Sequence, residues 1–466
     1  MFRYRWSFLL AIALLASLDA RPILADEPVT EAKVEDAKPA ALTGQKEVEL
    51  LQLFADTLDQ VERNYVQPID RRELMEAAIR GMLTKLDAHS SYIPPAELDR
   101  FKSSVENEFG GIGVTVTLET GQLTVVSPIL GSPAYRVGIR GGDALAEIDG
   151  QSTTGWTIDE AVRRVKGRAG TNVKITVKHA ADGKVETLEV PRELVRVDSI
   201  LGDRRNADDT WNFFLDEQRK IGYVRITNFS RHTTDELRTA VGELTRGGMT
   251  GLIVDLRFNP GGLLTTAIEV SDLFVADGRI VSTAGRSGPQ RVWDAQKDGT
   301  FEGFPIAVLI NRTSASASEI LAACLQDHDV ATIIGERTWG KGSVQNVIEL
   351  EEGKSALKLT TAGYVRPSGK NIHRREGAAD TDEWGVRPDA GFELKLTADE
   401  NEAYLTDRRQ RDAIVAHAAD SPPPAGERSN SDGGLRKYDK QLQMAYDHLL
   451  QKLAAPKPPV EMADAQ

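Results

Sequence analysis

Apolar side chains recur at helical spacing near both ends of the chain. Between Val48 and Val66 they return every three or four positions, which predicts an amphipathic helix. A second helix is expected from about residue 71 to 86, and two more at roughly 398–418 and 435–454. The sequence therefore predicts helical segments at the N-terminal and C-terminal ends of the folded part.

The pattern in the middle of the chain changes twice. Residues 111–193 alternate apolar and polar positions over short, glycine-rich stretches and contain one helical pattern, as expected for a small β domain. Residues 221–350 alternate strand-like apolar runs, such as 252–256 and 306–310, with helical stretches, which is typical of an α/β layer. We therefore predict an α+β multidomain protein: an α/β core with an inserted β-sandwich or barrel-like domain and helical terminal segments.

The first residues have the pattern of an export signal. Arg3 and Arg5 precede an apolar run over residues 8–18, and small residues follow at Ala20 and Ala25. A basic flank, a short apolar run and a small exit residue predict a secretory signal peptide, cleaved after one of these two alanines. The run is shorter than the ~20 residues that span a bilayer. We therefore expect export to the periplasm or the medium, with a retained anchor as the alternative.

These patterns divide the chain into segments. They are a signal peptide (1–25), a disordered lead-in (26–44), an N-terminal helical segment (45–108), a glycine-rich β domain (109–193), an α/β core (194–396), a C-terminal helical segment (397–454) and a disordered tail (455–466). Several domains are expected for 466 residues, because single cores rarely grow beyond ~250–300 residues.

Composition narrows the functional classes. Charged residues make up 27% and hydrophobic residues 40% of the chain, the balance of a globular protein. Lys and Arg total 57 against 70 Asp and Glu, and the formal charge is −13, which disfavours nucleic acid as a partner. The one cysteine, Cys324, excludes an intramolecular disulfide and a cysteine-cluster metal site, and its apolar neighbours predict a core position.

A glycine turn opens the predicted β domain. In Gly111-Ile112-Gly113-Val114 the turn leads directly into an alternating strand over 112–117. Backbone N–H groups in such a turn can converge on a carboxylate, and an edge strand can pair with an extended peptide. Downstream, Thr157 to Glu160 has the pattern of a capping box at the start of a helix.

At this point the segment resembles a PDZ domain. The resemblance rests on the glycine turn, the capped helix and four short motifs between them: Ser132-Pro133-Ala134, Gly138-Ile139, Gly142-Asp143 and Ile148-Asp149-Gly150. It implies capture of a free polypeptide C-terminus between the 112–117 strand and the 157–165 helix, with Gly111, Ile112, Gly113 and Val114 as the peptide-binding residues. The alternative is a small β domain that binds no ligand.

A run of small residues follows the apolar strand 306–310. In Ser314-Ala315-Ser316-Ala317-Ser318 a substrate backbone could approach a hydroxyl closely at the junction of a strand and a helix. The helix N-terminus would also favour developing negative charge. By itself, this run is also explained by helix capping.

A serine needs a base to become a nucleophile, and a lysine can supply one. None of the seven histidines lies in a recognisable hydrolase pattern. Lys341, between Gly340 and Gly342 and close to Trp339, is a candidate, because burial lowers the pKa of a lysine from its usual ~10.4. The alternative is a solvated lysine in a turn.

Together these motifs resemble those of the carboxyl-terminal processing proteases, also called tail-specific proteases. Four blocks match in order: the PDZ segment, Asp255-Leu256-Arg257-Phe258-Asn259-Pro260-Gly261-Gly262, the serine run ending at Glu319, and residues 335–345. Lys341 follows Ser316 by 25 residues, which is the spacing that the family uses and selects Ser316 among the three serines.

The resemblance implies a role for each matching residue. Ser316 would be the nucleophile, Lys341 its general base, and Gln345 would orient Lys341. The N–H groups of Gly262 and Ala317 would form the oxyanion hole. Asp327 matches a position associated with supporting the site, although a carboxylate on a helix surface is an equal alternative. Family members commonly carry Asn where this chain has Phe258, which should change packing below the loop and no catalytic atom.

The sequence thus predicts an exported serine endopeptidase that acts on the C-terminal regions of partly unfolded or precursor proteins. Two other classes compete with it: a PDZ scaffold on an inactive protease domain, and a serine esterase or amidase for small substrates. No metal or organic cofactor is implied. The expected partners are proteins with free apolar C-termini; an activating adaptor and a homodimer are both compatible with the sequence.

Overall fold

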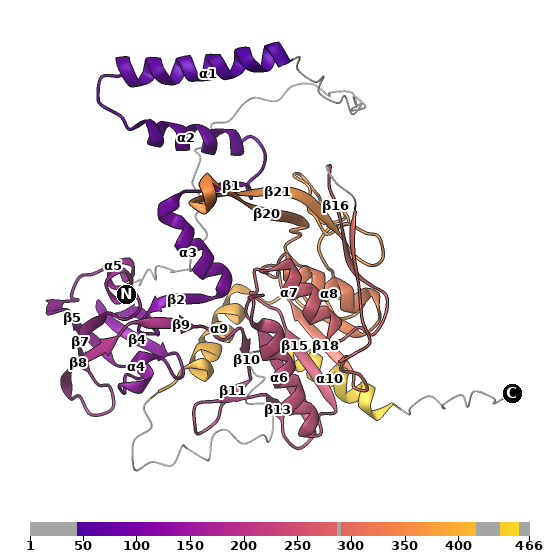
Figure 1. The fold of residues 1–466 in the computed structure, drawn as a ribbon. Coiled ribbons are helices and arrows are strands. Elements are labelled where there is room, and N and C mark those ends of the chain that lie inside the picture. Colours follow the sequence, from indigo (N-terminus) through magenta and orange to yellow (C-terminus); the bar gives the residue numbers. More distant parts are fainter. Residues whose placement is uncertain (1–43, 287–289, 416–438, 456–466) are drawn as a thin grey trace, which may run out of the picture. The chain divides into compact units, whose positions relative to one another are not determined.

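The computed structural model describes residues 44–286, 290–415 and 439–455 (Figure 1). It separates into two units, one up to residue 74 and one from residue 75. The expected signal peptide, most of the expected lead-in, nearly all of the expected tail and the segment 416–438 lie outside the described residues.

The first unit is helical, as the apolar spacing predicts. Helix α1 (Gly44–Asn64) contains no buried residue. Helix α2 (Arg71–Leu83) begins beside Asp70, whose side chain accepts hydrogen bonds from two N–H groups of the first turn, at 2.8 and 3.1 Å, and so satisfies donors that a helix start leaves free. Both helices end two or three residues before the expected ends, at Asn64 and Leu83.

A six-stranded sheet forms the centre of the α/β core. Its strands are β10 (Ile200–Leu201), β13 (Phe214–Asp216), β14 (Ile221–Ile226), β15 (Gly251–Asp255), β18 (Ile306–Ile310) and β19 (Ala331–Gly335). The order is β10-β14-β15-β18-β19, with β13 also paired to β14. Strands β14, β15, β18 and β19 run parallel. Both faces of β15 and β18 are buried, which explains their continuous apolar runs.

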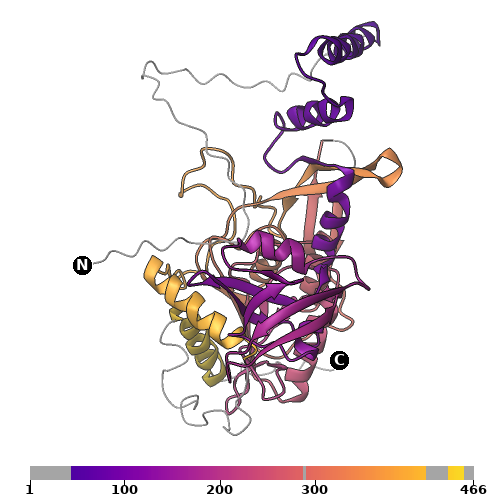
Figure 2. The ribbon, with the colours of Figure 1, turned by 90° about the vertical axis from the view of Figure 1, so that its left-hand side faces the viewer.

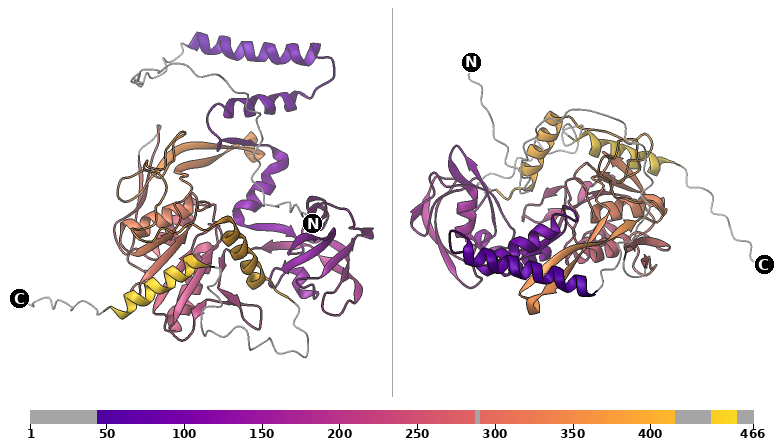
Figure 3. Two further views of the ribbon diagram at one scale, coloured as in Figure 1. Left: turned by 180° about the vertical axis from the view of Figure 1, so that it is seen from behind. Right: turned by 90° about the horizontal axis from the view of Figure 1, so that it is seen from above.

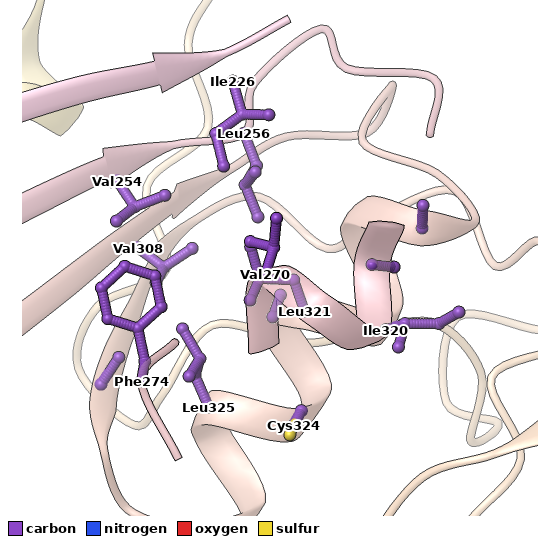
Figure 4. Close-up of a cluster of buried hydrophobic side chains, with 14 of the residues drawn as sticks. Ile226, Val254, Leu256, Val270, Phe274, Val308, Ile320, Leu321, Cys324 and Leu325 are labelled. Atoms are coloured by element: carbon purple, nitrogen blue, oxygen red, sulfur yellow. The ribbon is translucent and has the colours of Figure 1, made fainter. Parts of the chain in front are cut away.

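Helices cover both faces of this sheet. Helices α6 (Thr233–Arg246), α7 (Leu264–Asp272) and α8 (Ala317–Asp327) pack against one face, and Figure 4 shows part of the apolar cluster between them. Helix α10 (Lys440–Ala454) packs on the other face, as the left view of Figure 3 shows. Cys324 is fully buried in the first cluster, which confirms the predicted core position, and burial raises its pKa to about 12.

A second, antiparallel sheet carries the other wall of the core. It consists of β1 (Ser91–Ile93), β16 (Arg279–Ala284), β17 (Arg291–Asp294), β20 (Ser343–Leu350) and β21 (Ser355–Val365), with the short 3-10 helix η1 (Glu351–Gly353) between the last two. Helix α3 (Pro95–Glu106) packs against this sheet, where Leu98 and Phe101 contact Ile93 and Ala356. The predicted α/β core is therefore present, with a separate β layer beside its parallel sheet.

The inserted β domain faces the viewer in Figure 2. Its sheet contains β3 (Val114–Glu119), β4 (Gln122–Pro128), β5 (Ala144–Ile148), β6 (Gln151–Ser152), β7 (Asn172–Lys178) and β8 (Val185–Pro191), in the order β3-β4-β5-β7-β8 with β6 on β5. Helix α5 (Ile158–Val165) is the predicted one. The expectation of a single helix is wrong, because the Ser132 side chain also caps a one-turn helix, α4 (Pro133–Arg136), at the N–H of Tyr135.

Three connections join this domain to the core. Strand β2 (Glu108–Gly111) enters the domain and pairs with β9 (Glu193–Arg196), which leaves it. A hairpin of β11 (Arg204–Arg205) and β12 (Trp211–Asn212) holds Asp209, which accepts a 2.9 Å hydrogen bond from Tyr135. Beyond helix α9 (Ala398–Asp412), Ile414 accepts a 2.8 Å hydrogen bond from the N–H of Gly141. The C-terminal helices begin at residues 398 and 440; α9 ends before the expected residue 418.

Candidate active site

Ser316 lies at the end of the turn between strand β18 and helix α8, directly before the helix. Its backbone has φ 57° and ψ −113°, a conformation that L-residues rarely adopt, and it precedes the first residue of the helix. The residue is 7% exposed. Strain of this kind is frequent where a fold presents a nucleophile at a sharp turn between a strand and a helix.

The two other serines of the run hold this turn in place. The hydroxyl of Ser314 donates to the carbonyl of Leu256 at 2.8 Å, and that of Ser318 donates to the carbonyl of Asn259 at 3.0 Å. The N–H of Ala315 also donates to the Asn259 carbonyl, at 3.0 Å. The serine run is thus bonded to the segment that follows β15, which explains why hydroxyl-bearing residues flank Ser316.

Gly261 and Gly262 complete the other side of the turn. A Cβ on Gly261 would lie 2.8 Å from the Cβ of Ser316 and 2.9 Å from the backbone nitrogen of Ala317, and its φ is +102°. A Cβ on Gly262 would lie 2.1 Å from the carbonyl oxygen of Phe229. Among the described residues, the N–H groups of Gly262 and Ala317 have no hydrogen-bond acceptor. Two free donors therefore flank Ser316.

Ser316 and Lys341 line the same cleft, whose volume is about 1310 Å³. Burial lowers the pKa of Lys341 from its ordinary value, the positive charge of Lys358 lowers it further, and only the nearby carboxylate of Glu319 opposes the shift. Tyr364 lines this cleft as well, and burial raises the pKa of its phenol to about 12. The cleft thus brings together an alcohol and an amine that loses its proton more readily than usual.

A buried carboxylate connects the serine turn to the lysine loop. Oε2 of Glu319 accepts from the backbone N–H groups of Ser316 and Lys341, each at 2.8 Å, and Oε1 accepts from the N–H of Gly340 at 2.7 Å and the hydroxyl of Thr338 at 2.5 Å. Glu319 is fully buried, and burial raises its pKa although these four hydrogen bonds act against that shift. Glu319 therefore bonds to the backbone of both Ser316 and Lys341.

Sequence reasoning did not single out Glu319, although a signal for it is present. Ser316 and Glu319 have the S-x-x-E spacing of a capping box, in which the glutamate returns to the backbone N–H of the first residue. That returning bond is the 2.8 Å contact from the N–H of Ser316. The extension of the same carboxylate to residues 338–341 depends on tertiary structure. Tyr364 and Lys358 had no recognisable motif.

Gln345 and Asp327 occupy different places relative to the cleft. Gln345 lines it, and its amide donates to the hydroxyls of Ser343 at 2.9 Å and Thr360 at 3.1 Å. Asp327 lies at the opposite end of α8 from Ser316 and pairs with Arg366 at 2.6 Å. Arg366 directly follows β21, the strand that carries Tyr364. The structure thus places Gln345 in the cleft with Ser316 and Lys341, and Asp327 at the far end of α8, paired with the residue that follows β21.

Phe258 adopts a left-handed backbone conformation, with φ +63°. Asparagine tolerates this region far better than a bulky aromatic residue, so the Phe at this position has to be stabilised by its surroundings. Its N–H donates to Asn311 at 3.0 Å, and its ring stacks on Tyr404 with centroids 5.9 Å apart. The Phe258 ring thus makes a packing contact with α9.

The peptide-binding residues expected in the β domain lie at the start of its edge strand β3 and directly before it. Ile112 and Gly113 form the break between β2 and β3, and the strand itself begins at Val114 rather than at residue 112. The carbonyls of Ile112 and Gly113 are held by the N–H groups of Ala134 and Ile129. Strand β3 is first in the sheet order, so its outer edge has no strand partner among the described residues, and α5 packs beside it. This arrangement suits addition of an extended peptide.

Four features define a serine-type peptidase with a peptide-binding domain: a serine at a strained strand-to-helix turn, two free amide donors, a half-buried lysine and a domain with an open sheet edge. Comparisons with known proteins agree. Peptidase family S41 matches residues 220–391, the PDZ domain family matches 124–179, and the activating protease CtpB N-terminal domain matches 21–95.

Relatives cover most of the chain. A carboxy-terminal-processing protease of Bartonella bacilliformis is 37% identical over 385 residues, which are 79% of this chain and 83% of the relative. The carboxy-terminal processing protease CtpA of Bacillus subtilis is 34% identical over 72% of this chain and 67% of its own. The solved photosystem II D1 C-terminal processing protease is 28% identical, with a TM-score of 0.42 over 76% of this chain and 94% of its own. This chain belongs to the carboxy-terminal processing protease family.

Proposed function

We propose that this protein is an exported endopeptidase that captures C-terminal tails in its PDZ domain and cleaves partly unfolded or precursor proteins by a Ser–Lys dyad. The observation that carries the dyad is the shared cleft, in which burial and Lys358 lower the pKa of Lys341 beside Ser316. An amine of lowered pKa is neutral in a larger fraction of molecules and can accept a proton.

The geometry supports an acyl-enzyme sequence. Ser316 Oγ attacks the scissile carbonyl while Lys341 Nζ takes the hydroxyl proton, and the carbonyl oxygen becomes an oxyanion beside the free N–H groups of Gly262 and Ala317. As the C–N bond breaks, Lys341 returns the proton to the leaving amine. Water, deprotonated by the same amine, then releases the acid from Ser316. We assign Gln345, beside Lys341 in the cleft, the role of orienting the amine.

The first test uses the tail as the variable. A protein substrate with an apolar C-terminal tail should be cleaved, and the same substrate with an amidated terminus should be cleaved more slowly, because the turn at Gly111–Val114 then loses the carboxylate that its N–H groups bind. Mass spectrometry of the products and steady-state rates measure this difference.

Ser316→Ala serves as the matched control: it should bind the tail and leave the substrate intact. Binding without cleavage by the unaltered protein would favour a PDZ scaffold, and tail-independent turnover of small esters would favour an esterase.

The pH dependence of turnover follows from the charge near the base. Only the neutral amine of Lys341 accepts a proton, so activity should rise with pH through the pKa of this residue, which lies below its ordinary value of 10.5. Lys358→Met removes a positive charge that lowers this pKa. The pKa should therefore rise, and the acidic limb of the profile of kcat/KM should move to higher pH with its plateau kept.

Lys354→Met, at an exposed position of the neighbouring turn, is the control and should leave the profile in place. A limb that stays fixed in Lys358→Met would contradict the assignment of Lys341 as base.

Export, partners and assembly complete the proposal. The pattern of residues 1–25 carries the expectation of export. None of the helices in the described ranges is long and apolar enough to cross a bilayer. For a homodimer, the relevant surface is α1, where Leu51, Phe54 and Val61 are 70%, 43% and 37% exposed and would be covered by a second copy.

A further inference from the structure

Arg257 is a buried cation held by carboxylates from two distant parts of the chain. Asp255, two residues earlier, contacts its guanidinium at 2.6 Å (Nη2) and 3.0 Å (Nε). Asp439 contacts it at 2.8 Å through both Nη1 and Nη2, and Gln441 accepts from Nη1 at 3.1 Å. Arg257 is 3% and Asp439 2% exposed. The second carboxylate comes from the start of α10, at the C-terminal end of the described chain.

The segment that Arg257 begins leads directly to the free amide donors. Asn259 is fully buried, donates to the carbonyl of Ile226 at 2.8 Å and accepts from the N–H of Gly261 at 2.8 Å. The Asn259 carbonyl holds Ala315 and Ser318 on either side of Ser316. A displacement of Arg257 would therefore be transmitted to Gly262 through a short turn whose residues are held by hydrogen bonds.

The C-terminal helices contact this turn at two consecutive residues. Tyr404 of α9 lies under both, with the guanidinium carbon of Arg257 4.5 Å from its ring centroid and the Phe258 ring stacked on it. Asp439, directly before α10, supplies a negative charge to the Arg257 guanidinium. Figures 2 and 3 show α9 and α10 close together, and Lys440 pairs with Glu400 between them. Both helices thus contact the Arg257–Phe258 pair, in which the backbone of Phe258 is strained, with φ +63°.

We propose that Asp439 is a positioning residue for the oxyanion hole and acts through Arg257. This inference rests on the proposed Ser–Lys mechanism. With Asp439 neutral, the buried guanidinium keeps a single carboxylate and moves toward Asp255, since an incompletely paired buried charge is costly. The turn from Arg257 to Gly262 then shifts with it. Donors that stabilise an oxyanion have to be held within ~0.5 Å of their productive position, so the loss falls on the transition state.

Asp439→Asn in the full chain tests this directly. Asparagine has the same shape and is an equally good N-cap, so the bond from the Leu442 N–H that begins α10 can be kept. We expect kcat to fall roughly 10-fold to 100-fold while KM changes little. A peptide aldehyde forms a hemiacetal with Ser316 whose oxygen occupies the oxyanion hole. Its inhibition constant should rise by a similar factor, whereas that of the matching peptide alcohol, which forms no oxyanion, should not change.

Three further variants make the test decisive. Asp447→Asn, on the exposed side of the same helix, is the matched control and should leave all four constants unchanged. Asp439→Glu keeps the charge and should recover part of the lost kcat. Tyr404→Leu removes the ring beneath Arg257 and Phe258 without changing any charge, and should give the same signature if Asp439→Asn does not fold.

The outcomes separate this inference from the mechanism beneath it. If the unaltered protein binds the aldehyde through Ser316 but Asp439→Asn lowers only the melting temperature, with kcat and aldehyde binding kept, Asp439 is merely structural and the inference is overturned. If the unaltered protein shows no aldehyde binding above that of the alcohol, the proposed serine mechanism itself fails.

Discussion

A chain in which methionine replaces Lys341 should lose peptide-bond hydrolysis, with kcat reduced roughly 10³-fold or more. Methionine keeps an unbranched chain of similar length and fills the half-buried site, but it cannot accept the proton of Ser316. The loss should persist at every pH, because in the proposed dyad Lys341 is the base that accepts the Ser316 hydroxyl proton. Single-turnover cleavage of a tail-bearing protein measures it, and calorimetry with a C-terminal peptide should show unchanged binding at the PDZ edge.

The controls for this experiment are already present in the chain. Lys354→Met changes the same residue type at an exposed position and should retain full turnover. Lys358→Met should be active with a displaced pH profile, so the two cleft lysines would be distinguished by the kind of effect. Substantial cleavage by Lys341→Met at high pH would mean that another base activates Ser316, and the dyad would have to be abandoned.

The second large effect is expected at Glu319. In Glu319→Gln, a carboxylate with two accepting oxygens is replaced by an amide with one oxygen and one NH2 group, yet all four partners are donors: three backbone N–H groups and the Thr338 hydroxyl. At least one donor then faces another donor in a fully buried site. We expect about 1–3 kcal/mol of lost stability and, because the serine turn and the lysine loop separate, a fall in kcat of roughly 10²-fold.

This prediction distinguishes positioning from simple destabilisation. Chemical denaturation measures the stability, and turnover well below the unfolding transition measures kcat on folded protein. Glu349→Gln, on an exposed position of β20, is the matched control and should affect neither quantity. A folded Glu319→Gln protein with normal kcat would show that the shared carboxylate does not set the distance between Ser316 and Lys341.

Local patterns were sufficient to predict the elements around the nucleophile. The apolar run 306–310, the small residues after it and the apolar stretch that follows place Ser316 at a strand-to-helix junction, and the structure has this junction. The alternation of strand and helix signals also predicted the α/β layer, and the period of the apolar residues predicted the terminal helices. Element ends were less accurate, as at α9 and β3, because capping and β-bulges respond to tertiary contacts as well as to sequence.

What the sequence could not predict depends on contacts between distant segments. Asp439 and Arg257 are 182 positions apart, and neither lies in a pattern that points to the other. The lowered pKa of Lys341, which lies in a loop, arises from burial and from Lys358 on strand β21. The one-turn helix α4 is too short to have a period, so only the Ser-Pro start signal was available for it. Family resemblance supplied the pairing of Ser316 with Lys341 that the residues alone left open.

The position of Cys324 has a practical consequence for experiments on this enzyme. Its sulfur lies in the interior of the apolar cluster, and a thiol with a pKa of about 12 supplies almost no thiolate at neutral pH. Maleimides and other thiol-directed dyes should therefore leave the native protein unlabelled. A cysteine introduced at one surface position would carry a fluorophore or a spin label without first mutating the natural one, so the motion of the tail-binding domain during turnover could be followed in an otherwise unaltered enzyme.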